Sequence, residues 1–178
     1  MSFIAEVPRK GRRKMKQDRL KQVTLLAILI AVNVVIARVF LIPLPMTHGN
    51  INLCDAGIFI AALLLGRYAG AVVGGFSGFF LDLISGFPQY MFFSLIIHGL
   101  EGYLAGMLSE KNGKYASWLG LTVGVVVMVG GYLISDSLMY TLQTGLIGVP
   151  LNFVQGLAGA FVALPVYYRL GNRVFSNK

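Results

Sequence analysis

The stretch PLPMTHGNINLCD, residues 43–55, is polar and rich in turn-forming residues, and it separates two long apolar segments. Its prolines, Pro43 and Pro45, prevent the preceding helix from continuing, and the Thr-His-Gly-Asn sequence after them favours an ordered loop. Asn52 is placed to cap the next helix, with Asp55 in its first turn. We expect this loop to close over a small polar ligand held among helices.

The composition indicates a membrane protein. Of the 178 residues, 56% are hydrophobic and 12% charged, and the mean hydropathy is +0.74. Soluble domains have about 25% charged residues. One domain is expected at this length. The single cysteine, Cys54, cannot form an intramolecular disulfide, and we expect it to be a small buried residue at a helix start.

The apolar segments predict an all-α bundle of six membrane helices, at about residues 20–41, 52–66, 69–84, 89–108, 116–140 and 151–170. With both termini in the cytoplasm, fourteen of the fifteen Lys and Arg residues lie inside, and Arg38 is the exception. The chain then divides into a basic N-terminal tail (1–19), a membrane domain (20–172) and a basic C-terminal tail (173–178). The N-terminal tail fits an anionic lipid surface of the plasma membrane, so no nucleic-acid partner is expected.

Small residues mark two of the predicted helices. Glycines recur at nearly four-residue spacing in residues 70–78, which predicts close packing against a neighbouring helix. Ala27 and Ala31 give the first helix a shallow patch, a common pattern that alone indicates internal packing. The segment 141–150 contains Gly145, Gly148 and Pro150 and is expected to be a connecting loop.

Polar side chains recur at helical spacing in otherwise apolar segments. Tyr90, Ser94, His98 and Glu101 fall on one helix face. Ionisable groups at membrane depth usually mark a functional cavity or a partner. We therefore expect one substrate-binding site beneath the 43–55 loop, made by His48, Asn50, Asp82, Tyr90, Ser94, His98, Glu101, Tyr132, Asp136, Tyr140, Asn152 and Gln155.

Three points about these polar groups stay open. His98 and Glu101 could instead form a structural pair, because buried charges are normally paired. Asp55 and Asp82 could instead fix the ends of helices. Asn33 and Arg38 could each pair with one of the carboxylates.

Several kinds of chemistry have no motif here. The chain lacks a GxxxxGK[ST] phosphate loop, HExxH, GxSxG and a Cys/His metal cluster. We expect no catalytic residues, no metal, no cofactor and no enzyme activity. A small ion-coupled carrier or channel, with Asp55, Asp82, Glu101 and Asp136 as a relay, is the alternative of another class, although no internal repeat supports it. A membrane enzyme is a third and weaker possibility.

The chain resembles the substrate-binding S components of energy-coupling factor (ECF) vitamin transporters over about residues 20–170. The resemblance rests on Ala27xxxAla31, on IPLPMTHGNINLCDAGIFIAALLLGRYAGAVVGG (42–75), on DLISG (82–86) and on HGLEGYLAG (98–106). The last three resemble the branch that includes hydroxymethylpyrimidine and pyridoxine transporters.

The resemblance implies capture of a vitamin or precursor from outside and delivery inward with an EcfT-like transmembrane coupling protein and two ATPase subunits. It implies that Ala27 and Ala31 dock the coupling protein, that the 43–55 loop is the substrate lid, and that the whole component tilts in the lipid bilayer. Hydroxymethylpyrimidine is the expected ligand, with pyridoxine or pantothenate as alternatives. In that case Glu101 would accept the aminopyrimidine donors, Tyr132 or Tyr140 would stack on the ring, and Asn152 or Gln155 would bind the hydroxymethyl group.

Overall fold

The structure is a computed structural model that describes the backbone of residues 9–43, 50–111 and 115–175 and the side chains of residues 17–43, 50–111 and 115–170. Five of its helices contain a stretch long and apolar enough to cross a membrane, and the sixth, α2, is shorter. The predicted all-α membrane bundle is confirmed. The helices are α1 (Arg9–Val39), α2 (Cys54–Leu65), α3 (Arg67–Ser85), α4 (Met91–Ser109), α5 (Ala116–Met139) and α6 (Leu142–Phe175).

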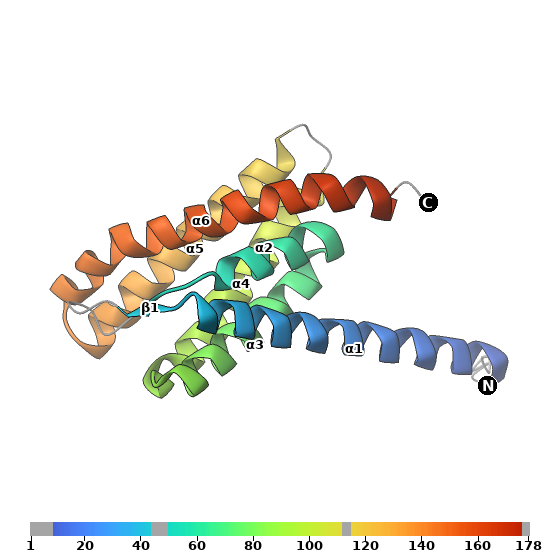
Figure 1. The fold of residues 1–178 in the computed structure, drawn as a ribbon, viewed down its shortest axis with the longest axis horizontal. Helices are drawn as coiled ribbons and strands as arrows, with labels where there is room; N and C mark the ends of the chain where they lie inside the picture. The colour runs from blue at the N-terminus through green and yellow to red at the C-terminus, as the bar shows by residue number, and fades with distance from the viewer. Residues whose placement is uncertain (1–8, 44–49, 112–114, 176–178) are drawn as a thin grey trace, which may run out of the picture.

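The short helix α2 lies at the centre of the bundle (Figure 1). Eight of its twelve residues are buried, as expected for a helix that is apolar on almost every side. Phe59 and Leu63 pack with residues of α4, α5 and α6, whereas Ile58 packs with residues of α1 and α3. The other helices therefore surround α2, and its first turn lies deep inside the protein.

The predicted loop before α2 contains a short strand pair. Strands β1 (Ile42–Pro43) and β2 (Asn50–Ile51) are antiparallel, with Ile42 opposite Ile51. Asn52 then accepts a hydrogen bond from the backbone N–H of Cys54 at 2.7 Å. The prediction that Asn52 is the helix cap is wrong by one residue, because the residue at the N-cap position of α2 is Leu53. The β pairing was not predicted, because two-residue strands have no detectable sequence period.

The glycines of α3 bring this helix into close contact with α4, as predicted. A Cβ atom on Gly70 would lie 2.5 Å from the carbonyl oxygen of Gly102, and one on Gly75 would lie 2.8 Å from that of Leu95. A Cβ on Gly74 would overlap the carbonyl oxygen of His98. Only a glycine fits at these positions, so the α3 surface fixes the position of the α4 backbone at His98.

The prediction of a loop at 141–150 is wrong, because α6 already begins at Leu142. Thr141 caps the helix, since its hydroxyl accepts the backbone N–H of Thr144 at 3.2 Å. Pro150 and Pro165 both lie inside α6. A chain at membrane depth satisfies its backbone groups best by staying helical, and this requirement outweighs the helix-breaking tendency of a single proline. The first helix also begins earlier than predicted, at Arg9 rather than residue 20.

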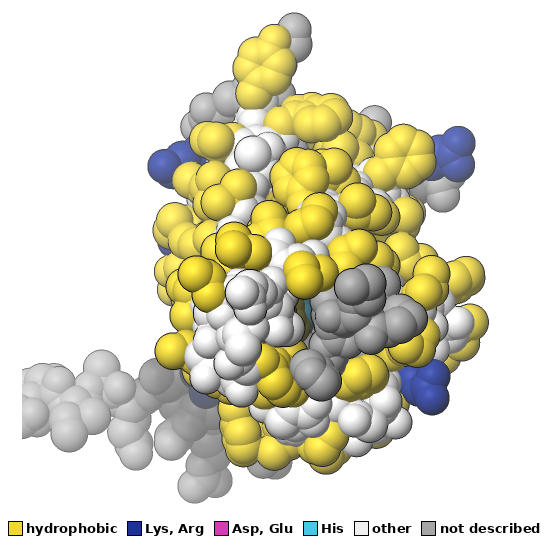
Figure 2. Space-filling view, turned by 90° about the vertical axis from the view of Figure 1, so that its left-hand side faces the viewer, with side chains coloured by type: hydrophobic (Ala, Val, Ile, Leu, Met, Phe, Trp, Pro, Cys, Tyr) yellow, Lys and Arg dark blue, Asp and Glu magenta, His cyan; other side chains and the backbone are white. Residues whose placement is uncertain are grey.

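The two ends of the described chain lie at the same end of the bundle, and β1 lies at the other (Figure 1). Figure 2 looks onto the end with the β pair. Apolar side chains cover most of it, Lys and Arg are seen only near its outline, and no carboxylate is visible. Four carboxylates are buried within the bundle instead, those of Asp55, Asp82, Glu101 and Asp136.

Candidate functional site

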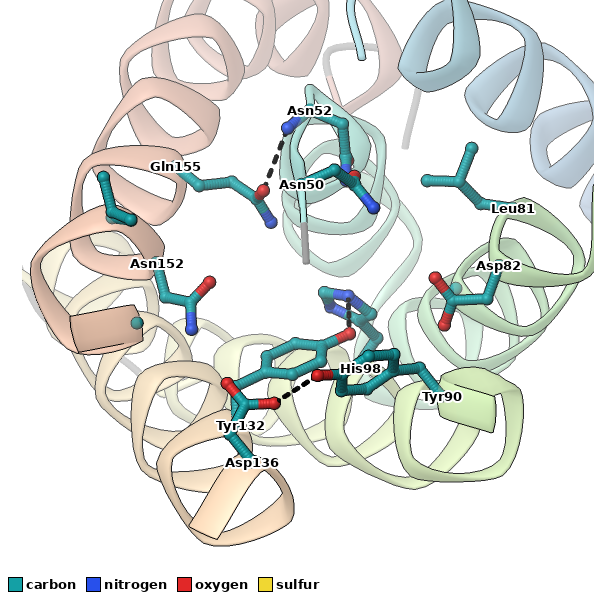
Figure 3. Close-up of a pocket in the computed structure, with 13 residues that line it drawn as sticks. Asn50, Asn52, Leu81, Asp82, Tyr90, His98, Tyr132, Asp136, Asn152 and Gln155 are labelled. Atoms are coloured by element: carbon teal, nitrogen blue, oxygen red, sulfur yellow. Dashed lines mark hydrogen bonds between the residues drawn. The ribbon is translucent and has the colours of Figure 1, made fainter. Parts of the chain in front are cut away.

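A polar cavity lies below β2, among the ends of the surrounding helices. The space open to the centre of a water molecule is about 40 Å³, more than the 10–15 Å³ or so that one water requires. Figure 3 shows the labelled side chains around an open centre. The lining residues are Asn50, Asn52, Gly78, Leu81, Asp82, Tyr90, His98, Tyr132, Asp136, Gly148, Leu151, Asn152 and Gln155.

One wall of the cavity is aromatic and acidic. The hydroxyl of Tyr90 donates a hydrogen bond to Oδ1 of Asp136 at 2.7 Å, which joins the start of α4 to α5. The ring of Tyr90 also lies 6.4 Å from the ring of Tyr132 and 6.3 Å from that of Tyr140, between centroids. This wall offers ring surfaces and a carboxylate to a ligand.

A chain of hydrogen bonds leads from this wall into the protein interior. The hydroxyl groups of Ser94 and Tyr132 are 2.6 Å apart, and the Tyr132 hydroxyl is 3.0 Å from Nε2 of His98. On the other side of the imidazole, Nδ1 lies 2.6 Å from Oε2 of Glu101. His98 therefore has one nitrogen toward the cavity wall and the other toward a fully buried carboxyl group.

Asp55 belongs to the same buried group. Its Oδ1 atom lies 3.6 Å from Nδ1 of His98, and Asp55 is fully buried. Oxygen and nitrogen atoms of Asp55, His98 and Glu101 lie within 4.8 Å of one another, which is close enough to share a cation or a proton. The 2.6 Å separation of His98 and Glu101 is that of a hydrogen bond, so a proton lies between them.

Amides form the wall nearest the strands. The backbone N–H of Asn52 donates to Oε1 of Gln155 on α6 at 2.9 Å, and the Asn52 side chain donates to Oδ1 of Asn50 at 2.8 Å. These bonds hold β2 and the start of α2 against α6. The amide groups of Asn50, Asn152 and Gln155 provide both donors and acceptors to a ligand.

Asp82 offers a hydrogen-bond acceptor for which the described part of the chain provides no donor. Asp82 is buried and lines the cavity, and its Oδ2 atom has no hydrogen-bond partner there. No lysine or arginine is among the lining residues. An unpaired buried acceptor is costly, so a ligand that donates a hydrogen bond to it would be stabilised.

The structure brings most of the predicted site residues to this one cavity. Eight of the twelve line it, and Ser94 and Glu101 lie directly behind lining residues to which they bond. Tyr140 is one step away, in ring contact with Tyr90. His48 lies outside the described residues. Glu101 does not line the cavity and is hydrogen-bonded to His98, as in the alternative of a structural pair. Its contact with a ligand stays a prediction.

Sequence reasoning did not assign some of the lining residues to the site. Asn52 was interpreted only as a cap, although its backbone N–H also reaches Gln155. Leu81 and Leu151 are apolar neighbours of assigned polar residues and carry no signal of their own in the sequence. Asp55 was left between a helix-end role and a site role. It lies in the first turn of α2, as predicted, and its Oδ1 atom also lies 3.6 Å from Nδ1 of His98.

Asn33 and Arg38 of α1 are not paired with any described carboxylate. The Asn33 amide donates to the carbonyl oxygen of Cys54 at 3.0 Å and also contacts its sulfur at 3.5 Å. Arg38 is exposed and forms no ion pair with another described residue. Cys54 is a free, buried cysteine, as predicted.

A family model for the S component of ECF-type riboflavin transporters matches residues 17–171. The chain belongs to this S component family. It is also 44% identical over 161 residues to the thiamine precursor transporter HmpT of Lactococcus lactis subsp. cremoris strain MG1363, which covers 88% of the chain and 93% of that protein. A Pyrococcus woesei protein described only as "uncharacterized protein in gap 3'region" is 31% identical over 134 residues, or 75% of the chain and 90% of that protein.

Family membership establishes the general role of the protein. It is the substrate-capture component of an ECF-type importer in the plasma membrane, not an enzyme. An S component works with the membrane-embedded T component and the ATPases of the transporter and binds a small vitamin-type substrate. The cavity of this S component is the candidate site for that substrate.

Proposed function

We propose that this S component captures hydroxymethylpyrimidine from outside the cell. The observation that carries the proposal is the Oδ2 atom of Asp82, a buried acceptor on the cavity wall without a hydrogen-bond partner in the described chain. The exocyclic amino group of an aminopyrimidine is a hydrogen-bond donor that could satisfy this acceptor. The similarity to a thiamine precursor transporter supports the same class of ligand.

The charge of the site supports a neutral or cationic ligand. Asp82 and Asp136 both line the cavity, and neither lysine nor arginine does. An anionic vitamin such as pantothenate would meet like charges in a poorly hydrated site and would be repelled. Pyridoxine also lacks a carboxylate, so it is the alternative ligand that binding experiments must distinguish from hydroxymethylpyrimidine.

The size of the site supports a single ring. The space for water centres, about 40 Å³, and the ring contacts of Tyr90 and Tyr132 suit one flat heterocycle. Riboflavin, for which the family model is described, has three fused rings and a ribityl chain. It would need this cavity to open substantially, so the description of the family does not fix the ligand of this member.

Within the site, we assign the recognition of donors to Asp82 and Asp136. Tyr90 holds Asp136 through its 2.7 Å hydrogen bond, and the rings of Tyr90, Tyr132 and Tyr140 supply the stacking surface. We assign the hydroxymethyl group to Asn152 or Gln155, which both line the cavity. Asn50 belongs to the 43–55 segment, which we propose closes the site.

The test of this assignment is Asp82→Asn, which keeps the shape of the side chain but replaces an acceptor oxygen by a donor nitrogen. We expect affinity for hydroxymethylpyrimidine to fall by about tenfold or more. The ligand-free variant should be as stable as the wild type or more so, because an unpaired buried carboxylate has been removed. Isothermal titration calorimetry and thermal melting measure the two effects.

The matched control is Asp18→Asn, because Asp18 is an exposed carboxylate on α1. It should bind the ligand with wild-type affinity. Unchanged affinity in Asp82→Asn would show that the Asp82 carboxylate does not recognise the ligand.

We further propose that Ala27 and Ala31 dock the coupling protein, which two ATPase subunits drive. Both alanines line an apolar groove of about 760 Å³ between α1 and α3, together with Val72, Phe76 and Phe80 of α3. Small residues beside a groove allow a partner helix to approach closely.

The test of this docking surface is Ala31→Phe, which should abolish uptake while leaving ligand binding intact. The control is Val126→Phe, at an exposed position on α5, which should leave both uptake and ligand binding intact. Uptake at the wild-type rate by Ala31→Phe would place the docking surface elsewhere.

A further inference from the structure

Asp55 is the buried acidic group that the proposed recognition of the ligand does not use. It is fully buried, and neither of its carboxyl oxygens has a hydrogen-bond partner among the described residues. The Oε1 atom of Glu101, which is equally buried, also lacks one. Of the four carboxyl oxygens of Asp55 and Glu101, only Oε2 of Glu101 therefore has a hydrogen bond within the described chain, the 2.6 Å bond with Nδ1 of His98.

The surroundings of this group supply no positive charge except the imidazole itself. Among the described residues, the buried polar side chains include neither lysine nor arginine. Cys54 of α2, Asp82 of α3 and Tyr132 of α5 are the further titratable groups near the cluster, and each of them is neutral or negative. Asn33 of α1 and Gln155 of α6 contribute uncharged amides.

Two ionised carboxylates at this depth would repel each other and lose their hydration. Buried carboxyl groups this close instead titrate as a unit and retain a proton, as the paired carboxyls of aspartic proteases do. His98 and Tyr132 connect the unit to the cavity, because both line it and are joined by a 3.0 Å hydrogen bond. When a ligand displaces water from His98 and Tyr132, the carboxyl groups of Asp55 and Glu101 behind them lose hydration. Their ionised form then becomes less stable.

We infer that Asp55 and Glu101 are positioning residues that hold a shared proton behind His98, and that filling the cavity draws one further proton from water into this cluster. The inference rests on the proposed function for its ligand. A proton bound more tightly in the complex than in the free protein favours binding at low pH. Affinity should therefore weaken as pH rises, by at most about tenfold per pH unit for one proton.

The experiment uses the purified protein in lipid nanodiscs and hydroxymethylpyrimidine as the probe. Calorimetric titrations in two buffers of different ionisation enthalpy give the number of protons taken up per ligand. We expect net uptake in the wild type and clearly less in Asp55→Asn. The comparison between variants cancels any proton that the pyrimidine itself gains, since the ligand is the same.

The matched control is Glu110→Gln, because Glu110 is a partly exposed carboxylate that is paired with Arg67 and does not line the cavity. Its proton uptake should equal that of the wild type. Equal uptake in Asp55→Asn and the wild type would overturn the inference, and so would binding without proton uptake in the wild type.

A second measurement needs no ligand. Infrared spectroscopy should show the carbonyl band of a protonated carboxyl group in the ligand-free wild type, and Asp55→Asn and Glu101→Gln should each weaken it. Absence of this band, or a stoichiometric metal ion found by mass spectrometry of the purified protein, would contradict the shared proton. Failure of hydroxymethylpyrimidine to bind would count against the proposed ligand, and the infrared result would still decide the state of the cluster.

Discussion

At the scale of single residues, the hydrogen bond between Tyr90 and Asp136 fixes the carboxylate of the cavity wall. In Tyr90→Phe the ring contacts remain but Asp136 loses this donor. We expect affinity for hydroxymethylpyrimidine to fall by about tenfold, the usual effect of losing a hydrogen bond to a charged group. Titration calorimetry measures the change.

Tyr103→Phe is the matched control for this substitution. Tyr103 packs against Tyr68 and does not line the cavity. Wild-type affinity in Tyr90→Phe, or an equal loss in Tyr103→Phe, would show that the phenol of Tyr90 does not order the site.

Single residues also show what periodicity could and could not reveal. Tyr90, Ser94, His98 and Glu101 share a face, as their spacing predicts. The spacing does not reveal that His98 separates Glu101 from the cavity, because this depends on side-chain orientation and on α2. Asp55 becomes the partner of His98 only when α2 occupies the bundle centre, and a 12-residue apolar segment does not specify that position.

At the scale of the elements, the close contact of α3 with α4 positions His98. A methyl group on Gly74 would collide with the His98 backbone. We therefore expect Gly74→Ala to lower the free energy of unfolding by about 1–3 kcal/mol, as overpacking usually does, and to weaken ligand binding at the same time. Thermal unfolding and calorimetry measure both.

Gly130→Ala on α5 is the control, because nothing lies within 4 Å of a Cβ atom at that position. It should be as stable as the wild type and bind equally well. If the two glycine variants behave alike, close α3–α4 packing does not set the geometry of the site.

The elements were predicted best where the hydrophobic pattern is long. The core of each membrane helix and the break at Gly66, whose φ of 91° favours glycine, follow from the sequence. The start of α6 does not, because Gly145, Gly148 and Pro150 indicate a turn in water, whereas a membrane setting and the Thr141 cap keep the segment helical.

At the scale of the whole molecule, the common end of the two termini and the distribution of Lys and Arg lead to a prediction of orientation. Helix α4 ends toward the end of the bundle that holds the termini, and α6 begins at the other end (Figure 1). Lys111 follows α4 and Gln143 lies in the first turn of α6, and both are exposed. A membrane-impermeant maleimide applied to intact cells should label Gln143→Cys and leave Lys111→Cys unlabelled.

The native Cys54 is buried and should stay unlabelled in both variants, so it provides an internal control. After the cells are permeabilised, Lys111→Cys should react as well. Labelling of Lys111→Cys and not of Gln143→Cys in intact cells would place the termini outside and the cavity at the cytoplasmic face. That orientation would contradict capture of the substrate from outside.

The central claim is that the protein binds hydroxymethylpyrimidine. The most direct test measures how much this compound, pyridoxine, pantothenate and riboflavin each raise the melting temperature of the purified protein. A ligand at a hundred times its dissociation constant stabilises by about 2.7 kcal/mol. A clear rise in melting temperature with hydroxymethylpyrimidine, and none of comparable size with the other three, is the predicted result. A rise with riboflavin or pyridoxine and none with hydroxymethylpyrimidine, in protein shown to be folded, would contradict the proposed ligand.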